Sequence, residues 1–170
     1  MEESINTWSG QQFNFLNPEP TQILIEDIAH ALSLQCRFNG HCEKFYSVAE
    51  HSIAVCKLVE ARGYSLEVIM TALLHDASEA YIGDIVSPLK KALPDYQVIE
   101  QGIEKVIAEK FSLQYPFPEA VHKADKDILE LEFSSLKPFS KEPSGALRCL
   151  SPEAAEAAFL DEYRRLGLRK

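Results

Sequence analysis

The 170-residue sequence lacks the features of secreted and membrane-spanning proteins. Its four cysteines form no C-x-x-C pair, and its first residues, Met-Glu-Glu-Ser, provide neither a basic start nor an apolar stretch. The longest apolar run, around Val68 to Leu74, is far shorter than the roughly 20 residues that a membrane span requires. We therefore expect reduced thiols, a cytoplasmic location and no association with a membrane.

Positive charge is also scarce. The chain has 17 Lys and Arg against 26 Asp and Glu, which gives a net charge of −9 at pH 7. This balance argues against a protein that binds long nucleic acid through its phosphates, because that class needs a broad basic face. A small anionic substrate remains compatible with it if a few cations are gathered locally. The length and the 46% hydrophobic content predict one globular domain over residues 1–170.

Helix signals dominate the sequence. A capping box at Ser47 begins a helix that Gly63 ends, and Ser65 can cap a second helix that runs to about Gly83. Further helices are predicted over 94–111, from 118 onward, over 151–167 and, with weaker signals, over 23–34. The Asn-Gly turn at 39–40 has too little alternation around it to support a sheet. We predict an all-α bundle of five to seven helices, with a mobile loop over 136–145, where Pro, Ser and Lys cluster.

Polar side chains lie on a face of the second helix that should be apolar. His75 and Glu79 continue a stripe begun by Val68 and Ala72, and Asp76 lies beside them. Burying an unpaired carboxylate costs several kcal/mol at least. These groups must therefore be neutralised, paired or bound to a cation.

Two more helices show the same pattern. His51 shares a stripe with Val48 and Val55, and Asp125 shares one with Val121. A single histidine on such a face is more often a core residue that is hydrogen-bonded to a carbonyl. Two histidines and two carboxylates without a cysteine suit Mn, Fe, Co, Zn or Mg better than a structural zinc site. The set therefore predicts a site for at least one divalent metal ion in the bundle interior.

These residues resemble a known signature. His51, the pair His75-Asp76 and Asp125 resemble the H…HD…D signature of the HD-domain metal-dependent phosphohydrolases, an all-α superfamily. The segment from His75 to Lys90 resembles the H-D-x-x-E-x-x-x-G-D-x-x-x-P-x-K motif of the branch that contains the 5'-deoxynucleotidases and the small phage dATP triphosphohydrolases. The stretch F-Y-S-V-A-E-H that ends at His51 and the Arg-Phe pair at 37–38 are similar to the same branch. The resemblance covers roughly residues 20 to 135 and implies an HD-type bundle.

The resemblance implies four metal ligands for a Co, Mn, Zn, Fe or Mg ion, namely His51, His75, Asp76 and Asp125. The helix pattern supports Asp125 independently. Asp125 falls on the buried stripe of its helix, whereas Asp127 falls on the polar side, where solvation explains it.

Two acidic residues are implied to be catalytic. Glu79 is placed to hold and orient the attacking water, and Asp84 to order that network or to contact the substrate. Structural alternatives stay open for both residues. Glu79 could instead be a hydrogen-bond partner of His75, and Asp84 could cap the following turn.

Four residues are implied to bind the substrate. Arg37 and Lys90 match positions that hold phosphate, and Phe38 and Pro88 are implied to face the base. The alternative for Lys90 is a surface salt bridge, since the adjacent Lys91 could be mistaken for it. The alternative for Phe38 is ordinary packing.

The implied function is hydrolysis of a 2'-deoxynucleoside 5'-phosphate, a small-molecule nucleotide, by a homo-oligomer such as is common among relatives. Two outcomes compete: release of the whole triphosphate from a dNTP such as dATP, and removal of one phosphate from a deoxynucleoside monophosphate by a 5'-deoxynucleotidase. The short chain and the F-Y-S-V-A-E-H stretch favour the triphosphohydrolase. A non-catalytic, metal-binding regulatory domain is the alternative from another class, and the presence of Glu79, Asp84, Arg37 and Lys90 argues against it.

Overall fold

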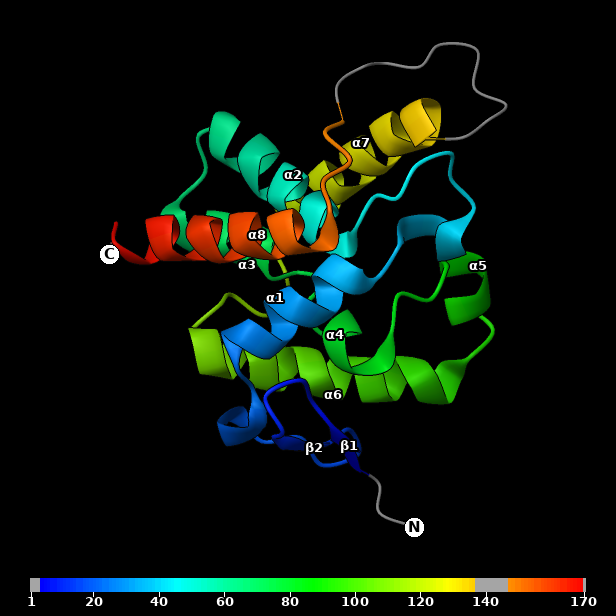
Figure 1. Ribbon diagram of the computed structural model, residues 1–170. Coiled ribbons are helices and arrows are strands. Elements are labelled where there is room, and N and C mark those ends of the chain that lie inside the picture. The colour runs from blue at the N-terminus through cyan, green and yellow to red at the C-terminus, as the bar shows by residue number, and fades with distance from the viewer. Residues whose placement is uncertain (1–3, 137–146, 170) are drawn as a thin grey trace.

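The computed structural model describes residues 4–136 and 147–169, and these are mostly helical (Figure 1). The helices are α1 Ile25–Leu34, α2 Val48–Ala61, α3 Leu66–Leu73, α4 Glu79–Ile82, α5 Ser87–Lys90, α6 Pro94–Phe111, α7 Glu119–Leu136 and α8 Pro152–Gly167. Short 3-10 turns, η1 Pro20–Gln22 and η2 Arg37–Gly40, flank α1. The all-α prediction is confirmed, but the described residues form eight helices rather than the predicted five to seven, and two of these, α4 and α5, have only four residues each. The loop predicted over 136–145 lies outside the described residues, except for Leu136, which ends α7.

A small antiparallel hairpin precedes the helices, β1 Ser4–Asn6 and β2 Gln12–Asn14, and the sequence analysis did not predict it. Strands of three residues are too short to show alternation, so tertiary contacts must hold them. Phe13 is fully buried and stacks on Tyr81 of α4 with ring centroids 3.9 Å apart. At the hairpin turn, Asp27 of α1 accepts hydrogen bonds from the hydroxyls of Thr7 and Ser9, both at 2.8 Å.

The predicted helix ends are largely confirmed because they are encoded by local side chains. Ser47 accepts a hydrogen bond from the backbone N–H of Glu50, and the Glu50 side chain returns to Ser47, which completes the capping box of α2. Pro94 lies at the first position of α6. Ser151 caps α8 by accepting from Ala154.

The single helix predicted from Ser65 to Gly83 is wrong, because the chain breaks between α3 and α4. Residues 74–78 form tight turns joined by hydrogen bonds between residues three apart, such as Ala77 N to Leu74 O at 3.1 Å. The Ala72 carbonyl, which a continuous helix would pair with a backbone N–H, instead accepts from Nδ1 of His75 at 2.8 Å. His75 and Glu79 therefore lie on a turn and on a separate short helix, not on one stripe.

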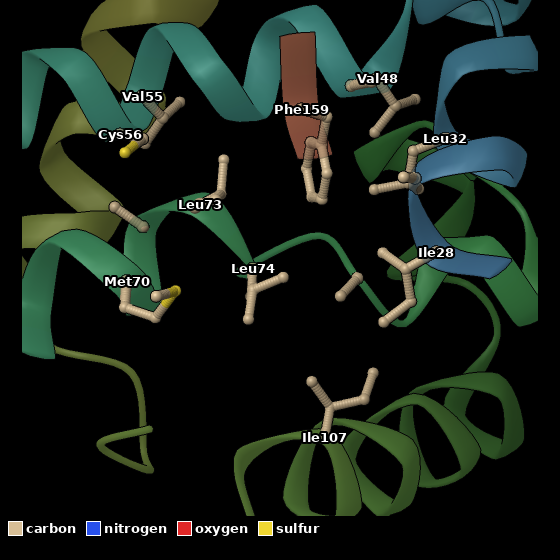
Figure 2. Packing of buried hydrophobic residues seen from close by; sticks show 14 of the residues in the cluster. Ile28, Leu32, Val48, Val55, Cys56, Met70, Leu73, Leu74, Ile107 and Phe159 are labelled. Atoms are coloured by element: carbon tan, nitrogen blue, oxygen red, sulfur yellow. The ribbon is translucent and has the colours of Figure 1, made fainter. Parts of the chain in front are cut away.

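The core forms where α1, α2, α3, α6 and α8 meet. Figure 2 shows Phe159 of α8 pointing among the buried side chains of the neighbouring helices, with Leu32 and Leu73 close by. Burying each such side chain contributes about 1.5–3 kcal/mol. Because α2 packs against both α3 and α7, this core brings one face of α2 next to the α3–α4 turn and to the middle of α7. Within the described residues, no helix has the length and apolar character needed to cross a membrane.

Candidate metal centre and substrate cavity

The four predicted metal ligands lie close together, although Asp76 is not part of the compact group that the other three form. His51 comes from α2, His75 and Asp76 from the α3–α4 turn, and Asp125 from α7. Nε2 of His51 lies 3.1 Å from an oxygen of Asp125 and 3.4 Å from one of Asp76. Nε2 of His75 lies 3.2 Å from the same Asp76 oxygen and 3.9 Å from Asp125. One ligand atom from each of His51, His75 and Asp125 fits within a 4.8 Å group.

Hydrogen bonds orient both imidazoles. Nδ1 of His51 lies 2.8 Å from Oε1 of Glu132, and Nδ1 of His75 lies 2.8 Å from the carbonyl oxygen of Ala72. Both partners are acceptors, so Nδ1 carries a proton in each ring, and Nε2 is the nitrogen that a neutral ring would present to a metal ion. Both Nε2 atoms are buried and make no well-formed hydrogen bond within the described part of the chain. Two such nitrogens beside two carboxylates form a donor set that fits a divalent ion.

The charges at this point favour a cation. Burial and Arg37 act to lower the pKa of His51, but Glu132 and Asp125 act in the opposite direction and raise it to about 9. Burial would raise the pKa of Asp125, yet His51 and His75 hold it well below its usual range. Both shifts arise because carboxylates and imidazoles lie close together, and they occur although burial opposes each of them. The same arrangement would stabilise a divalent ion.

Asp125 and Asp127 differ in what they face, not in how exposed they are. Their side chains are 39% and 38% exposed. Asp125 turns towards His51, while Asp127, two residues further along α7, pairs with Arg62 of the loop after α2. Asp127 thus lies on the polar side of α7, away from the site, and its partly exposed carboxylate forms a surface ion pair that the sequence analysis did not predict.

A cavity of about 610 Å³ opens beside the two carboxylates. All the predicted catalytic and substrate-binding residues line it, together with Asp76 and Asp125: Arg37, Phe38, Glu79, Asp84, Pro88 and Lys90. Apolar side chains that the sequence analysis did not select complete the wall: Ile85, Val86, Leu129 and Phe133. Phe133 meets Phe38 edge to face, with ring centroids 6.4 Å apart.

An unusual turn carries Arg37 and Phe38 to the cavity. Phe38, Asn39 and Gly40 all have positive φ, at 57°, 53° and 76°, and His41 N closes the turn on Phe38 O at 2.9 Å. The left-handed region costs about 1–2 kcal/mol for a residue with a side chain, so packing must hold Phe38 there. The turn leaves Arg37 only 8% exposed while Phe38 reaches the cavity wall.

Both predicted phosphate-binding cations are already paired with carboxylates. Arg37 donates from Nε and Nη2 to one oxygen of Glu132 at 3.3 and 3.1 Å, and its Nη1 lies 3.7 Å from Asp84. Lys90 donates to Glu100 at 2.7 Å and lies 3.9 Å from Glu79. Lys90 lines the cavity, while its neighbour at position 91 is exposed outside it.

Glu79 and Asp84 both line the cavity. Burial, reinforced by Asp76 and Asp84, raises the pKa of Glu79 well above its ordinary value, and its Oε2 has no hydrogen-bond partner among the described residues. The alternative that Glu79 orients His75 is not observed, since His75 uses the Ala72 carbonyl. Burial also raises the pKa of Asp84, against the opposing effect of Arg37.

Two residues of the site were missed. Glu132 is fully buried between His51 and Arg37, and these two partners lower its pKa although burial acts to raise it. Its position continues the buried stripe of Val121 and Ile128 on α7, so a carboxylate at that spacing was the available signal. Gln35 donates to the carbonyl of residue 79 at 2.9 Å and accepts from the N–H of residue 84 at 3.0 Å. No sequence pattern marked Gln35.

Comparison with known proteins agrees with this geometry. Residues 39–141 match the family model described as 5'-deoxynucleotidase YfbR-like. The uncharacterized protein YfdR of Escherichia coli is 43% identical over 128 residues, which span 75% of this chain and 69% of YfdR. The uncharacterized protein RCAP_rcc00048 of Rhodobacter capsulatus is 34% identical over 142 residues, which span 78% of this chain and 72% of that protein. All four predicted metal ligands lie inside the range that matches the family model, and Arg37 and Phe38 lie just before it.

Proposed function

The chain belongs to the family of YfbR-like 5'-deoxynucleotidases, and from this membership together with the cavity we propose that it removes phosphate from 2'-deoxynucleoside 5'-monophosphates with a divalent metal ion. The family consists of metal-dependent HD-domain hydrolases. One observation carries the proposal: two buried, unpartnered imidazole nitrogens face two carboxylates at the edge of a cavity that also holds an arginine and a lysine.

The charge of the cavity supports a substrate with few phosphates. Five acidic side chains line it: Asp76, Glu79, Asp84, Asp125 and Glu130. Arg37 and Lys90 are the two basic residues of the lining, and each already has carboxylate partners. A triphosphate carries several negative charges and would be repelled by this wall, whereas a monophosphate needs less compensation. We therefore favour the monophosphatase over the dATP triphosphohydrolase that the sequence analysis preferred, as the family description also does.

We assign the metal to His51, His75, Asp76 and Asp125. A divalent ion held there supplies Lewis acidity, which polarises a phosphoryl oxygen and lowers the pKa of bound water towards about 7. The acid with the unpartnered oxygen, Glu79, would hold the attacking water and accept its proton.

The other charged residues would orient the phosphate. Nη1 of Arg37 is the part of the guanidinium that Glu132 does not occupy, so it can turn from Asp84 to a phosphate oxygen. Lys90 would approach the phosphate as a point charge, and its hydrogen bond to Glu100 would hold the ammonium group in position. The guanidinium would leave Asp84 when the substrate binds and return to it when the product is released.

The apolar part of the wall is suited to the nucleoside. Phe38 and Phe133 form an edge-to-face pair, and Pro88 and Val86 add aliphatic surface to the same cavity. An aromatic face can stack a base, and aliphatic surface next to the sugar would give a ribose 2'-hydroxyl no compensation for its lost water. This chemistry supports a preference for deoxyribose.

The test is a substrate panel of deoxy- and ribonucleoside mono-, di- and triphosphates, each with Co, Mn, Mg, Zn or Fe, with products separated by chromatography. The proposal expects orthophosphate and deoxynucleoside from monophosphates, loss of turnover after chelation and recovery when metal is restored. Inorganic triphosphate from dATP would instead establish the triphosphohydrolase. A protein that binds metal tightly but hydrolyses no nucleotide would favour the non-catalytic regulatory domain.

A further inference from the structure

Glu132 of α7 lies between two groups of the site that approach it from different sides. Its Oε1 accepts from Nδ1 of His51 at 2.8 Å. Its Oε2 accepts from Nε and Nη2 of Arg37 at 3.3 and 3.1 Å. The Glu132 side chain is 0% exposed, so water cannot replace either partner. Neither the predicted ligand set nor the predicted phosphate-binding set includes this residue.

We propose that Glu132 is a positioning residue that serves both halves of the site with one carboxylate. One oxygen keeps the Nδ1 proton on His51 and so presents the Nε2 lone pair to the metal. The other oxygen holds Arg37 so that Nη1 faces the cavity. The inference rests on the proposed function, because it gives His51 and Arg37 the roles assigned above. It predicts that changes at the phosphate-binding arginine affect metal binding.

The chemistry requires a carboxylate and not merely a polar residue of the same shape. Both partners are hydrogen-bond donors, and they contact different oxygens of Glu132. A glutamine offers one carbonyl oxygen and one NH2 group, so it cannot accept from both. Arg37 carries a permanent charge and competes better for the single oxygen. His51 would then face the NH2 group, accept a hydrogen bond at Nδ1 and carry its proton on Nε2, where the metal should bind.

The same contacts explain why Arg37 is not an independent phosphate ligand. Its Nε and Nη2 edge is committed to Glu132, and Nη1 alone is free to exchange Asp84 for substrate. Truncation of Arg37 would also leave a buried carboxylate without its counter-charge, in direct contact with His51. A loss of activity in such a variant would therefore mix two effects.

The first test is calorimetric titration of chelator-stripped protein with Mn²⁺ or Co²⁺ in the absence of nucleotide. Glu132→Gln should weaken metal binding by roughly 10- to 100-fold, the range for removing a residue that orients a ligand. Glu130→Gln makes the same charge change on the same helix at an exposed position of the cavity wall. Glu162→Gln removes a buried carboxylate on α8, away from the cavity. Both controls should bind metal as the unmodified protein does.

The decisive test is a rescue. Replacing Arg37 by Met in the Glu132→Gln protein removes the competing donor, so the amide oxygen can turn to His51 and restore its tautomer. Metal affinity should return towards that of the unmodified protein, while KM for the nucleotide stays high because the guanidinium is gone. A glutamate that merely filled space would give no such rescue.

A second pair keeps the test valid if Glu132→Gln alone does not fold. Arg37→Met with Glu132→Gln and Arg37→Met with Glu132→Leu bury no unpaired charge and differ in whether Nδ1 of His51 has an acceptor. The Gln version should bind metal about 10- to 100-fold more tightly than the Leu version. Equal affinities in this pair, or unchanged affinity in Glu132→Gln, would overturn the proposal. Metal binding by the unmodified protein without hydrolysis of any nucleotide would overturn the proposed function and leave the role of Glu132 standing.

Discussion

Asp125 reaches from α7 to α2 and places a carboxylate oxygen 3.1 Å from Nε2 of His51, a nitrogen that makes no well-formed hydrogen bond among the described residues. Asp127, two residues away, turns to Arg62 instead. The two aspartates are almost equally exposed, so only the direction of the side chain separates the proposed metal ligand Asp125 from Asp127, which forms a surface ion pair. This contrast gives the site a matched internal control.

Asp125→Asn should lose most of its bound metal and its activity, because a neutral amide is a poor ligand for a hard cation. Asp127→Asn should keep both, and losing its surface ion pair should cost about 0–1 kcal/mol of stability. Metal content after dialysis and turnover, measured on both preparations, check this prediction. Equal metal loss in the two variants would mean that α7 presents a different face to His51.

Glu79→Gln should separate metal binding from catalysis. The residue has an unpartnered buried oxygen and is not part of the group of possible ligand atoms that His51, His75 and Asp125 form, so its replacement should leave metal content unchanged. Turnover should fall by about 100-fold or more, as expected for the loss of a positioned general acid or base. His75→Ala is the contrast, since it should lose metal and activity together. Loss of metal in Glu79→Gln would place that carboxylate among the ligands.

The elements that sequence analysis located well are those whose ends are encoded within a few residues. The capping box at Ser47 and the cap at Ser151 act on N–H groups three residues away, so the sequence alone reveals them. The break after Leu73 is different, because the stretch from Leu74 to Ala77 is compatible with a helix. At the break, the ring of His75 donates a hydrogen bond to the carbonyl of Ala72, which a continuous helix would pair with a backbone N–H. The same ring lies next to His51 of α2 and Asp125 of α7, and the sequence does not reveal these contacts.

The missed residues of the site depend on contacts between distant parts of the chain. Glu132 meets His51 across 81 residues and Arg37 across 95, and Gln35 meets Glu79 across 44. Periodicity shows that such a residue is buried but does not identify what it faces. The proposed metal ligands could be predicted because their motif spacing resembles that of a known family. Glu132 and Gln35, which contact the residues of these motifs, belong to no comparable signature.

Glu104 of α6 should make stability depend on pH. Burial and the nearby Glu100 raise the pKa of Glu104 to about 7, against a hydrogen bond donated by Tyr115 that acts to lower it. Between the ordinary glutamate pKa and about pH 7, the folded protein therefore binds more protons than the unfolded chain. The free energy of unfolding should decrease as the pH rises through that window.

Glu104→Gln removes this titration, so it should raise Tm more at about pH 8 than at about pH 5. Thermal unfolding of both proteins at the two pH values checks the prediction. The exposed Glu109 on the same helix provides the control, since Glu109→Gln makes the same chemical change at the surface of α6. A Tm gain for Glu104→Gln that is the same at both pH values would contradict the raised pKa.

Lys90 and Lys91 test the phosphate-binding assignment. Lys90 lines the cavity and donates to Glu100 at 2.7 Å, whereas Lys91 is exposed outside it. Lys90→Gln keeps a donor for Glu100 but removes the charge that would meet the phosphate.

Its KM for a deoxynucleoside monophosphate should rise by about 10- to 100-fold, which corresponds to the roughly 1.5–3 kcal/mol of a hydrogen bond to a charged group. Lys91→Gln makes the same charge change one residue away and should leave KM unaltered, since long-range attraction at the surface is screened by salt. Steady-state kinetics of the two variants at physiological ionic strength decide between a phosphate contact and a surface salt bridge. If both variants raised KM equally, Lys90 would act through the overall field of the protein, and the direct contact would be wrong.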